Sequence, residues 1–214
     1  HLPKGEVLLQ GELWSQAPSL PEPQGPDIQA IAGVFSSGTS QVPRLVLYSK
    51  QNLESSTSGI YELFDRDLLQ NIFCYPQPFH TFGLTLGYGA SEILGLPLIL
   101  PEGPYSKTHH QLWKSQVGDQ TLTLGTPTHF YDLVSQFESS DAVPPKSYSC
   151  IIGGAKVSRK LWKACQEKLN IQQPSIGYGA TEASPGNTHL PPGGVPREDG
   201  EIGIRFSNVD ERIT

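Results

Sequence analysis

The sequence predicts an α/β domain built on a largely parallel sheet with helices on both faces. Short apolar segments of strand character alternate with longer segments of helical periodicity between residues 28 and 178. Strands joined by a helix of ten or more residues need a crossover connection, which makes them parallel neighbours in one sheet. Ligands bind at the carboxyl ends of such strands, so the loops that follow the strands are the candidate sites.

The first half of the chain supplies seven of these elements. Short apolar runs predict strands at Ile28–Phe35, Leu45–Tyr48, Asn71–Tyr75 and Leu96–Leu100. Apolar residues at helical spacing predict helices at Gln51–Phe64, Phe82–Leu94 and Lys107–Val117.

The second half continues the alternation. Strands are predicted at Thr121–Leu124, Tyr148–Ile152 and Ser175–Tyr178. Between them, a helix at Thr128–Glu138 presents one apolar face, made of Phe130, Leu133, Val134 and Phe137. A second helix runs to Leu169, and Ser158 has the side chain to cap its start.

The composition bounds the domain organisation and the partners. Residues 1–27 contain Pro18, Pro21, Pro23 and Pro26 and are predicted to be a lead-in or linker, and residues 28–214 are predicted to form a single α/β domain. The net charge is -6 and no long basic run occurs, which disfavours nucleic acid and a polybasic membrane contact. The longest apolar stretch, Ile93–Leu100, is too short to span a bilayer.

The cysteines and the chain ends suggest the setting of the protein. Cys74, Cys150 and Cys165 are odd in number and far apart, which argues against a disulfide framework and a structural zinc site and favours the cytoplasm. The sequence contains no Met and ends directly after an apolar, strand-like stretch. We therefore expect a piece of a longer protein.

The loop Phe35–Arg44 is the first candidate site. Four hydroxyl-bearing residues, Ser36, Ser37, Thr39 and Ser40, flank Gly38 in this loop. Free backbone amides and hydroxyls can surround phosphate oxygens, and Arg44 adds a positive charge, so this is a candidate triphosphate loop. It is not a P-loop, because Thr39 stands where that motif requires Lys. A serine- and glycine-rich turn without a ligand is the alternative.

Three further segments carry candidate residues. In the loop after the Ser175–Tyr178 strand, Tyr178 can stack on a base, Thr181 can bond a phosphate and Glu182 can hold magnesium, although a tight turn with a solvated Glu is the alternative. His80 lies between aromatic residues, where packing is a more common role than catalysis. Gly153–Ala155 allows a ligand to approach the backbone, or makes a simple turn.

In their order and spacing these segments resemble the adenylate-forming (AMP-binding) superfamily, which includes acyl- and aryl-CoA synthetases, luciferases and peptide-synthetase adenylation domains. The matching segments are 36–44, 78–83, 153–155, 178–182, 201–203 and 208–213. The resemblance covers about residues 31 to 213, and implies that the chain is the central part of the large domain of such an enzyme.

The resemblance implies ATP-dependent activation of a small carboxylic acid as an acyl-adenylate, followed by transfer to a thiol such as coenzyme A. Among members of the superfamily, the chain resembles the compact ligases that act on aryl acids, such as o-succinylbenzoate-CoA ligase. The resemblance therefore implies an aryl acid as the substrate class. The implied catalytic residues are His80, Thr181 and Glu182, with Glu182 as the Mg²⁺ ligand. The implied ATP-binding residues are Ser36, Ser37, Gly38, Thr39, Ser40, Arg44, Gly153, Gly154, Ala155, Tyr178 and Gly179.

This sequence also departs from the pattern of the superfamily. Gln41 stands where the superfamily has Gly, Arg44 where it has Lys, and Leu45 where another Gly is common. A side chain at position 41 restricts a loop that must fold over a triphosphate. The ribose-binding Asp and the mobile C-terminal domain with its catalytic Lys have no counterpart before Thr214. The alternative is therefore a degenerate, catalytically inactive module that binds an acyl or nucleotide ligand.

Overall fold

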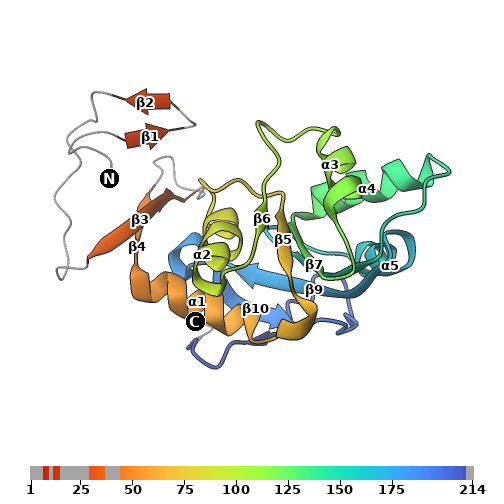
Figure 1. Cartoon of the computed structure of the whole chain (residues 1–214). Coiled ribbons are helices and arrows are strands. Elements are labelled where there is room, and N and C mark those ends of the chain that lie inside the picture. Colours follow the sequence, from red (N-terminus) through yellow and green to blue (C-terminus); the bar gives the residue numbers. More distant parts are fainter. Residues whose placement is uncertain (1–6, 10–11, 15–28, 37–43, 211–214) are drawn as a thin grey trace.

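The computed structural model describes residues 7–9, 12–14, 29–36 and 44–210 of the 214-residue chain (Figure 1). Its main body is a seven-stranded sheet in the order β11-β10-β9-β8-β7-β5-β6. The parallel strands are β5 (Asn71–Cys74), β6 (Leu98–Ile99), β7 (Thr121–Gly125), β8 (Ser147–Ile152) and β9 (Ile171–Gly179). Two antiparallel strands, β10 (Gly186–Leu190) and β11 (Ile204–Arg205), complete one edge.

Helices cover both faces of this sheet, as predicted (Figure 1). One face packs against α1 (Lys50–Tyr61), the π-helix η2 (Phe82–Gly89) and α2 (Ala90–Leu94). The other packs against α3 (His109–Gln116), α4 (Pro127–Glu138) and α5 (Arg159–Lys168). Successive strand residues alternate between two cores, since Ile151 packs on the α1 side and Ile152 on the α4 side. The α/β class is thereby confirmed.

The local signals of the helices agree with their positions in the structure. Ser158 caps α5, where its Oγ accepts a hydrogen bond from the Leu161 N–H at 3.1 Å. The predicted apolar face of α4 is buried throughout, at Phe130, Leu133, Val134 and Phe137. Helix α4 follows β7 and α5 follows β8, so the loops at the ends of these two strands lead into the helices that cover this face of the sheet.

Two pairs of strands lie outside the main sheet. The predicted strands near residues 28–48 are β3 (Ala30–Phe35) and β4 (Leu45–Ser49), which pair antiparallel with each other. β1 (Val7–Leu9) pairs antiparallel with β2 (Glu12–Trp14), within the segment predicted to be a lead-in. A short loop joins β3 to β4, so no crossover forces them into the parallel sheet.

The predicted helix 82–94 is a helix of mixed type. Its first part, η2, has the wider turns of a π-helix, and only Ala90–Leu94 is α-helical. A Cβ at Gly83 would overlap the carbonyl oxygens of Pro76 and Gln77, so the glycine lets the start of the helix pack against the chain that leads into it. This close packing keeps η2 beside the loop that carries His80.

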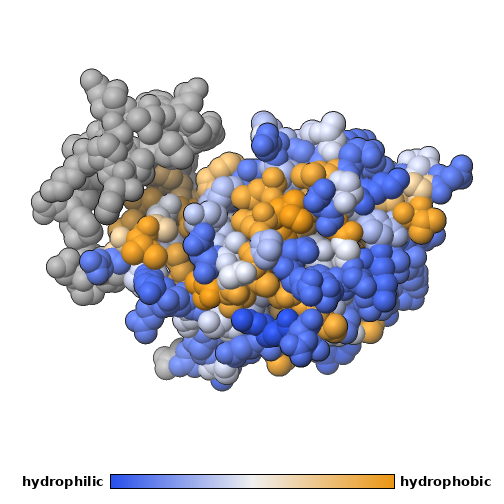
Figure 2. All heavy atoms as spheres, in the orientation of Figure 1, coloured by the Kyte–Doolittle hydropathy of each residue, from blue (hydrophilic) through white to orange (hydrophobic). Residues whose placement is uncertain are grey.

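Several further predictions from composition can be compared with the structure. The three cysteines are free and buried, and no metal-binding cluster of His, Cys, Asp or Glu occurs within the described ranges. None of the helices in those ranges is long and apolar enough to cross a membrane. Figure 2 shows apolar atoms gathered over the region of the edge strand β6, where Leu98 and Ile99 are half-buried, with polar atoms around them.

Candidate nucleotide and acyl site

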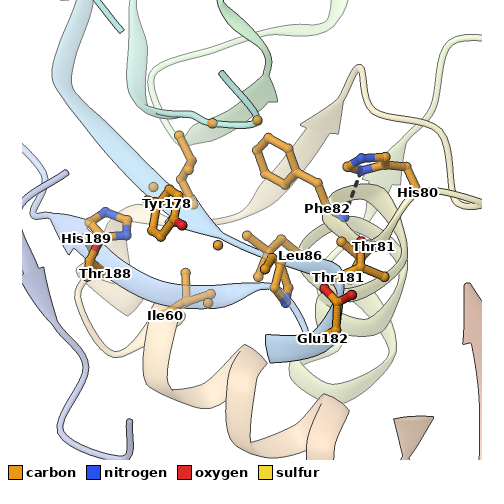
Figure 3. A pocket seen from close by; sticks show the side chains of 18 of the residues that line it. Ile60, His80, Thr81, Phe82, Leu86, Tyr178, Thr181, Glu182, Thr188 and His189 are labelled. Atoms are coloured by element: carbon orange, nitrogen blue, oxygen red, sulfur yellow. Dashed lines mark hydrogen bonds between the residues drawn. The ribbon is translucent and has the colours of Figure 1, made fainter. Parts of the chain in front are cut away.

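One cavity of about 290 Å³ lies at the carboxyl ends of β8 and β9 (Figure 3). Segments far apart in the sequence line it, from the end of β3 to the loop after β11. The candidate residues that line it are Ser36, His80, Gly153, Gly154, Tyr178, Gly179, Thr181 and Glu182. The fold therefore brings together three of the strand-end segments and the base of the candidate phosphate loop.

Other candidate residues lie elsewhere or are not described. Arg44 and Ala155 are exposed and do not line this cavity. The Ser36 N–H donates to the Arg44 carbonyl oxygen at 2.8 Å and so closes the base of the loop between them. The remaining candidates of that loop, Ser37, Gly38, Thr39 and Ser40, and the atypical Gln41, lie outside the described residues.

The glycines after β8 form a wall of the cavity that has no side chain. The Gly153 N–H donates to the Gly125 carbonyl oxygen at 3.0 Å, which continues the β7–β8 ladder by one bond. A Cβ at Gly153 would lie 3.0 Å from the Gly177 carbonyl oxygen and 3.3 Å from the Phe82 ring. Gly154 has a φ of 82°, in the left-handed region that favours glycine. A ligand can therefore contact the backbone here directly.

Tyr48 connects the β3–β4 sheet to the turn that carries Glu182. Tyr48 is 1% exposed, and its hydroxyl lies 2.5 Å from the Thr181 carbonyl oxygen and 2.9 Å from Thr81 Oγ1. Burial raises the pKa of Tyr48, and the nearby Glu182 carboxylate raises it further. Tyr48 therefore stays a neutral phenol and fixes the backbone of the turn η3 (Thr181–Ala183).

The loop between β9 and β10 is tightly folded around this turn. The Ala180 N–H donates to Asn187 Oδ1 at 3.1 Å, and Ser184 has a φ of 61°. A Cβ at Gly179 would overlap the Pro185 carbonyl oxygen, so only glycine fits the close approach of these two backbones. Figure 3 labels Glu182, Thr181 and Thr81, which all line the cavity.

His80 lies at the mouth of the cavity, directly before η2. The Phe82 N–H donates to His80 Nδ1 at 3.2 Å, drawn as a dashed line in Figure 3, so Nε2 carries the hydrogen of the neutral ring. The residue is exposed, yet neighbouring atoms remove enough water from the ring to lower the pKa of His80. Its Nε2–H is oriented by this bond and is available to an anionic or carbonyl oxygen.

Sequence reasoning did not name the rest of the lining as site residues, although Thr81, Phe82, Gly177 and Ala180 lie within the candidate segments. These residues are Ile60, Thr81, Phe82, Leu86, Ile151, Gly177, Ala180, Pro185, Gly186, Thr188, His189 and Phe206. Most belong to regular elements whose apolar residues follow the same pattern as any core residue, so no local signal distinguishes them. The strand β10, which carries Thr188 and His189, was not predicted at all.

A parallel sheet whose strand-end loops enclose one cavity defines an α/β ligand-binding domain. Backbone glycines, an aromatic ring, hydroxyls and one carboxylate line the cavity, which are groups suited to a nucleotide. A family model described as "AMP-binding enzyme" matches residues 2–214. The chain belongs to this family, which confirms the superfamily predicted from its motifs.

Individual proteins resemble the chain in sequence or in fold. The chain is 30% identical over 159 residues to the acyl-CoA ligase sidI of Aspergillus fumigatus, a match that covers 71% of this chain and 25% of the relative. The N-terminal domain of FACL13 from Mycobacterium tuberculosis has a similar fold, with a TM-score of 0.70, 22% identity, and coverage of 91% of this chain and 47% of that one. The ATP-bound MatB of Rhodopseudomonas palustris also has a similar fold, with a TM-score of 0.65 and 17% sequence identity. This match covers 83% of this chain and 34% of MatB. The chain thus spans about a quarter of the sidI ligase.

Proposed function

We propose that this chain binds MgATP and a carboxylic acid in the cavity at the ends of β8 and β9, as part of a ligase that activates the acid as an acyl-adenylate and transfers it to the thiol of coenzyme A. The observation that carries the proposal is the convergence of Ser36, His80, Gly153, Tyr178 and Glu182 on one cavity. These residues come from four segments of the chain that are far apart in the sequence, and turns unrelated in function would have no reason to converge in this way.

The residues present fit a nucleotide. The wall at Gly153 and Gly154 lets a flat base approach the backbone, and the half-exposed Tyr178 ring offers a stacking surface. Ser36 and Thr181 supply hydroxyls for phosphate oxygens. Glu182 would hold Mg²⁺, which offsets negative charge on the phosphates when it is bound.

The acid would enter beside His80. The Nε2–H of His80, oriented by the Phe82 N–H, can donate to a carboxylate oxygen and hold it toward the nucleotide. Beyond Phe82 the cavity becomes apolar at Ile60 and Leu86, which suits the rest of the acid. The chain's own contribution is therefore to position two reactants and to exclude water from the space between them.

Magnesium-dependent nucleotide binding tests this proposal. Calorimetry should show that MgATP binds more tightly than metal-free ATP, and that Glu182→Gln removes this advantage, because an amide oxygen replaces a charged ligand. Glu167→Gln, on the exposed side of α5, is the matched control and should retain the advantage. A magnesium advantage that survives Glu182→Gln would move the metal site elsewhere.

The catalytically inactive module remains the competing proposal, because of Gln41 and Arg44 in the phosphate loop. Activity should be measured with the whole protein that contains this chain, as pyrophosphate release with a panel of carboxylic acids. Binding of MgATP without pyrophosphate release from any acid would favour the inactive module, whereas release that depends on both acid and Glu182 supports the ligase.

A further inference from the structure

The part of the cavity next to α1 is apolar except for one imidazole. Cross-strand pairing places Gly177 opposite His189, and the Cβ position of Gly177 contacts Ile151, so these residues share the α1 face of the sheet. Apolar side chains around them line the same cavity, at Ile60, Leu86, Ile151 and Phe206. Thr188, which pairs with Tyr178, lies on the opposite face of the sheet.

The imidazole of His189 is buried, and one of its two nitrogen atoms has no hydrogen-bond partner among the described residues. The residue is 2% exposed, and its Nε2 has no partner among the described residues. The ring is held edge-on by Phe64 and Phe206, with centroid distances of 6.0 and 5.8 Å. Burial lowers the pKa of His189 to about 4, so the ring is neutral near pH 7.

A buried polar atom without a partner lowers the stability of the folded protein, since it gives up a hydrogen bond to water. A phenyl ring of similar size would fill the same space without this cost, because the neighbours of His189 are aromatic and aliphatic. The imidazole therefore has a use that the ligand-free chain does not show. A neutral imidazole offers one donor and one acceptor, and depending on its tautomer Nε2 serves as either.

We propose that the acid bound in this cavity carries an uncharged hydrogen-bonding group on its chain, such as a hydroxyl or a carbonyl, and that His189 Nε2 pairs with that group. This inference rests on the proposed function, since it assigns the apolar part of the cavity to the acyl chain. A plain hydrocarbon chain would leave Nε2 unpaired. A second carboxylate would be buried beside a neutral ring with no positive charge to balance it.

Stable acyl-adenylate mimics provide the test, because they are held by the nucleotide portion and differ only in the acyl group. The Kd is measured for N-acylsulfamoyl adenosines whose acyl group is a six-carbon chain. The reference compound carries a plain hydrocarbon chain. A series of analogues carries one hydroxyl or oxo group at successive positions of that chain, and a further analogue carries a terminal carboxylate. Sulfamoyl adenosine without an acyl group reports nucleotide binding alone. At least one hydroxyl or oxo analogue should bind about tenfold more tightly than the hydrocarbon analogue.

Variants at position 189 connect this preference to the imidazole. His189→Phe should reduce the preference to within about twofold, and His189→Gln, which keeps a donor and an acceptor, should retain part of it. His109→Phe removes an imidazole outside the cavity, whose Nε2 bonds the Glu102 carbonyl oxygen, and should leave the preference unchanged. Without ligand, His189→Phe should unfold at the same temperature as the native chain or at a higher one.

The outcomes separate this inference from the proposed function. If sulfamoyl adenosine and all analogues fail to bind, the proposed function fails and this inference fails with it. If the analogues bind with no preference for a polar group, or if the preference survives His189→Phe, only the role of His189 is overturned. A clear loss of thermal stability in His189→Phe would show that Nε2 has a partner in the native protein, and would also overturn it.

Discussion

Replacing Tyr48 by Phe should weaken both the fold and the nucleotide site. The substitution removes a hydroxyl that contacts the Thr181 carbonyl oxygen at 2.5 Å and Thr81 Oγ1 at 2.9 Å in a buried environment. Each buried group left without its partner costs about 1 kcal/mol, so the free energy of unfolding should fall by about 2 kcal/mol. For a chain of this size, that loss lowers the unfolding temperature by about 4–8 °C.

The same substitution should loosen the turn that presents Thr181 and Glu182. We expect MgATP to bind about fivefold more weakly to Tyr48→Phe, which is the equivalent of one lost hydrogen bond. Urea unfolding and calorimetry measure the two effects. Tyr131→Phe is the matched control, because the Tyr131 hydroxyl contacts Ser158 Oγ at 2.8 Å on the exposed surface, and it should change stability by less than about 0.5 kcal/mol. The reasoning is refuted if the two variants match in stability and MgATP affinity.

Two further predictions concern pH and backbone packing. Because burial lowers the pKa of His189 from 6.5 to about 4, the unfolded chain takes up a proton that the folded chain does not, so stability should fall by about 3 kcal/mol between pH 6.5 and pH 4. Urea unfolding should show a smaller fall in His189→Phe, and an equal fall would contradict the assignment. Gly179→Ala places a Cβ against the Pro185 carbonyl oxygen and should destabilise the chain by about 1–3 kcal/mol and weaken MgATP binding. Gly118→Ala, whose Cβ meets no atom within 4 Å, is the control, and equal stability of the two variants would refute the overlap.

The sequence by itself was sufficient for the class of fold and for most of the strand-end segments at the cavity. Alternation of apolar runs and helical spacing is a local property, and it predicts a parallel sheet because crossovers permit little else. Glycines and hydroxyls in loops are visible in the same way, which is why Gly153, Tyr178 and Glu182 could be named in advance. The phosphate loop stays a prediction, since residues 37–43 lie outside the described part of the chain.

Only the tertiary structure decided which side chains surround those segments. Tyr48 reaches a backbone group 133 positions away, and His189 enters the cavity because β10 pairs antiparallel with β9. Neither residue stands in a local pattern that distinguishes it from an ordinary core position. The order of strands in the sheet sets such contacts, and that order depends on packing between distant segments rather than on the spacing of residues within one.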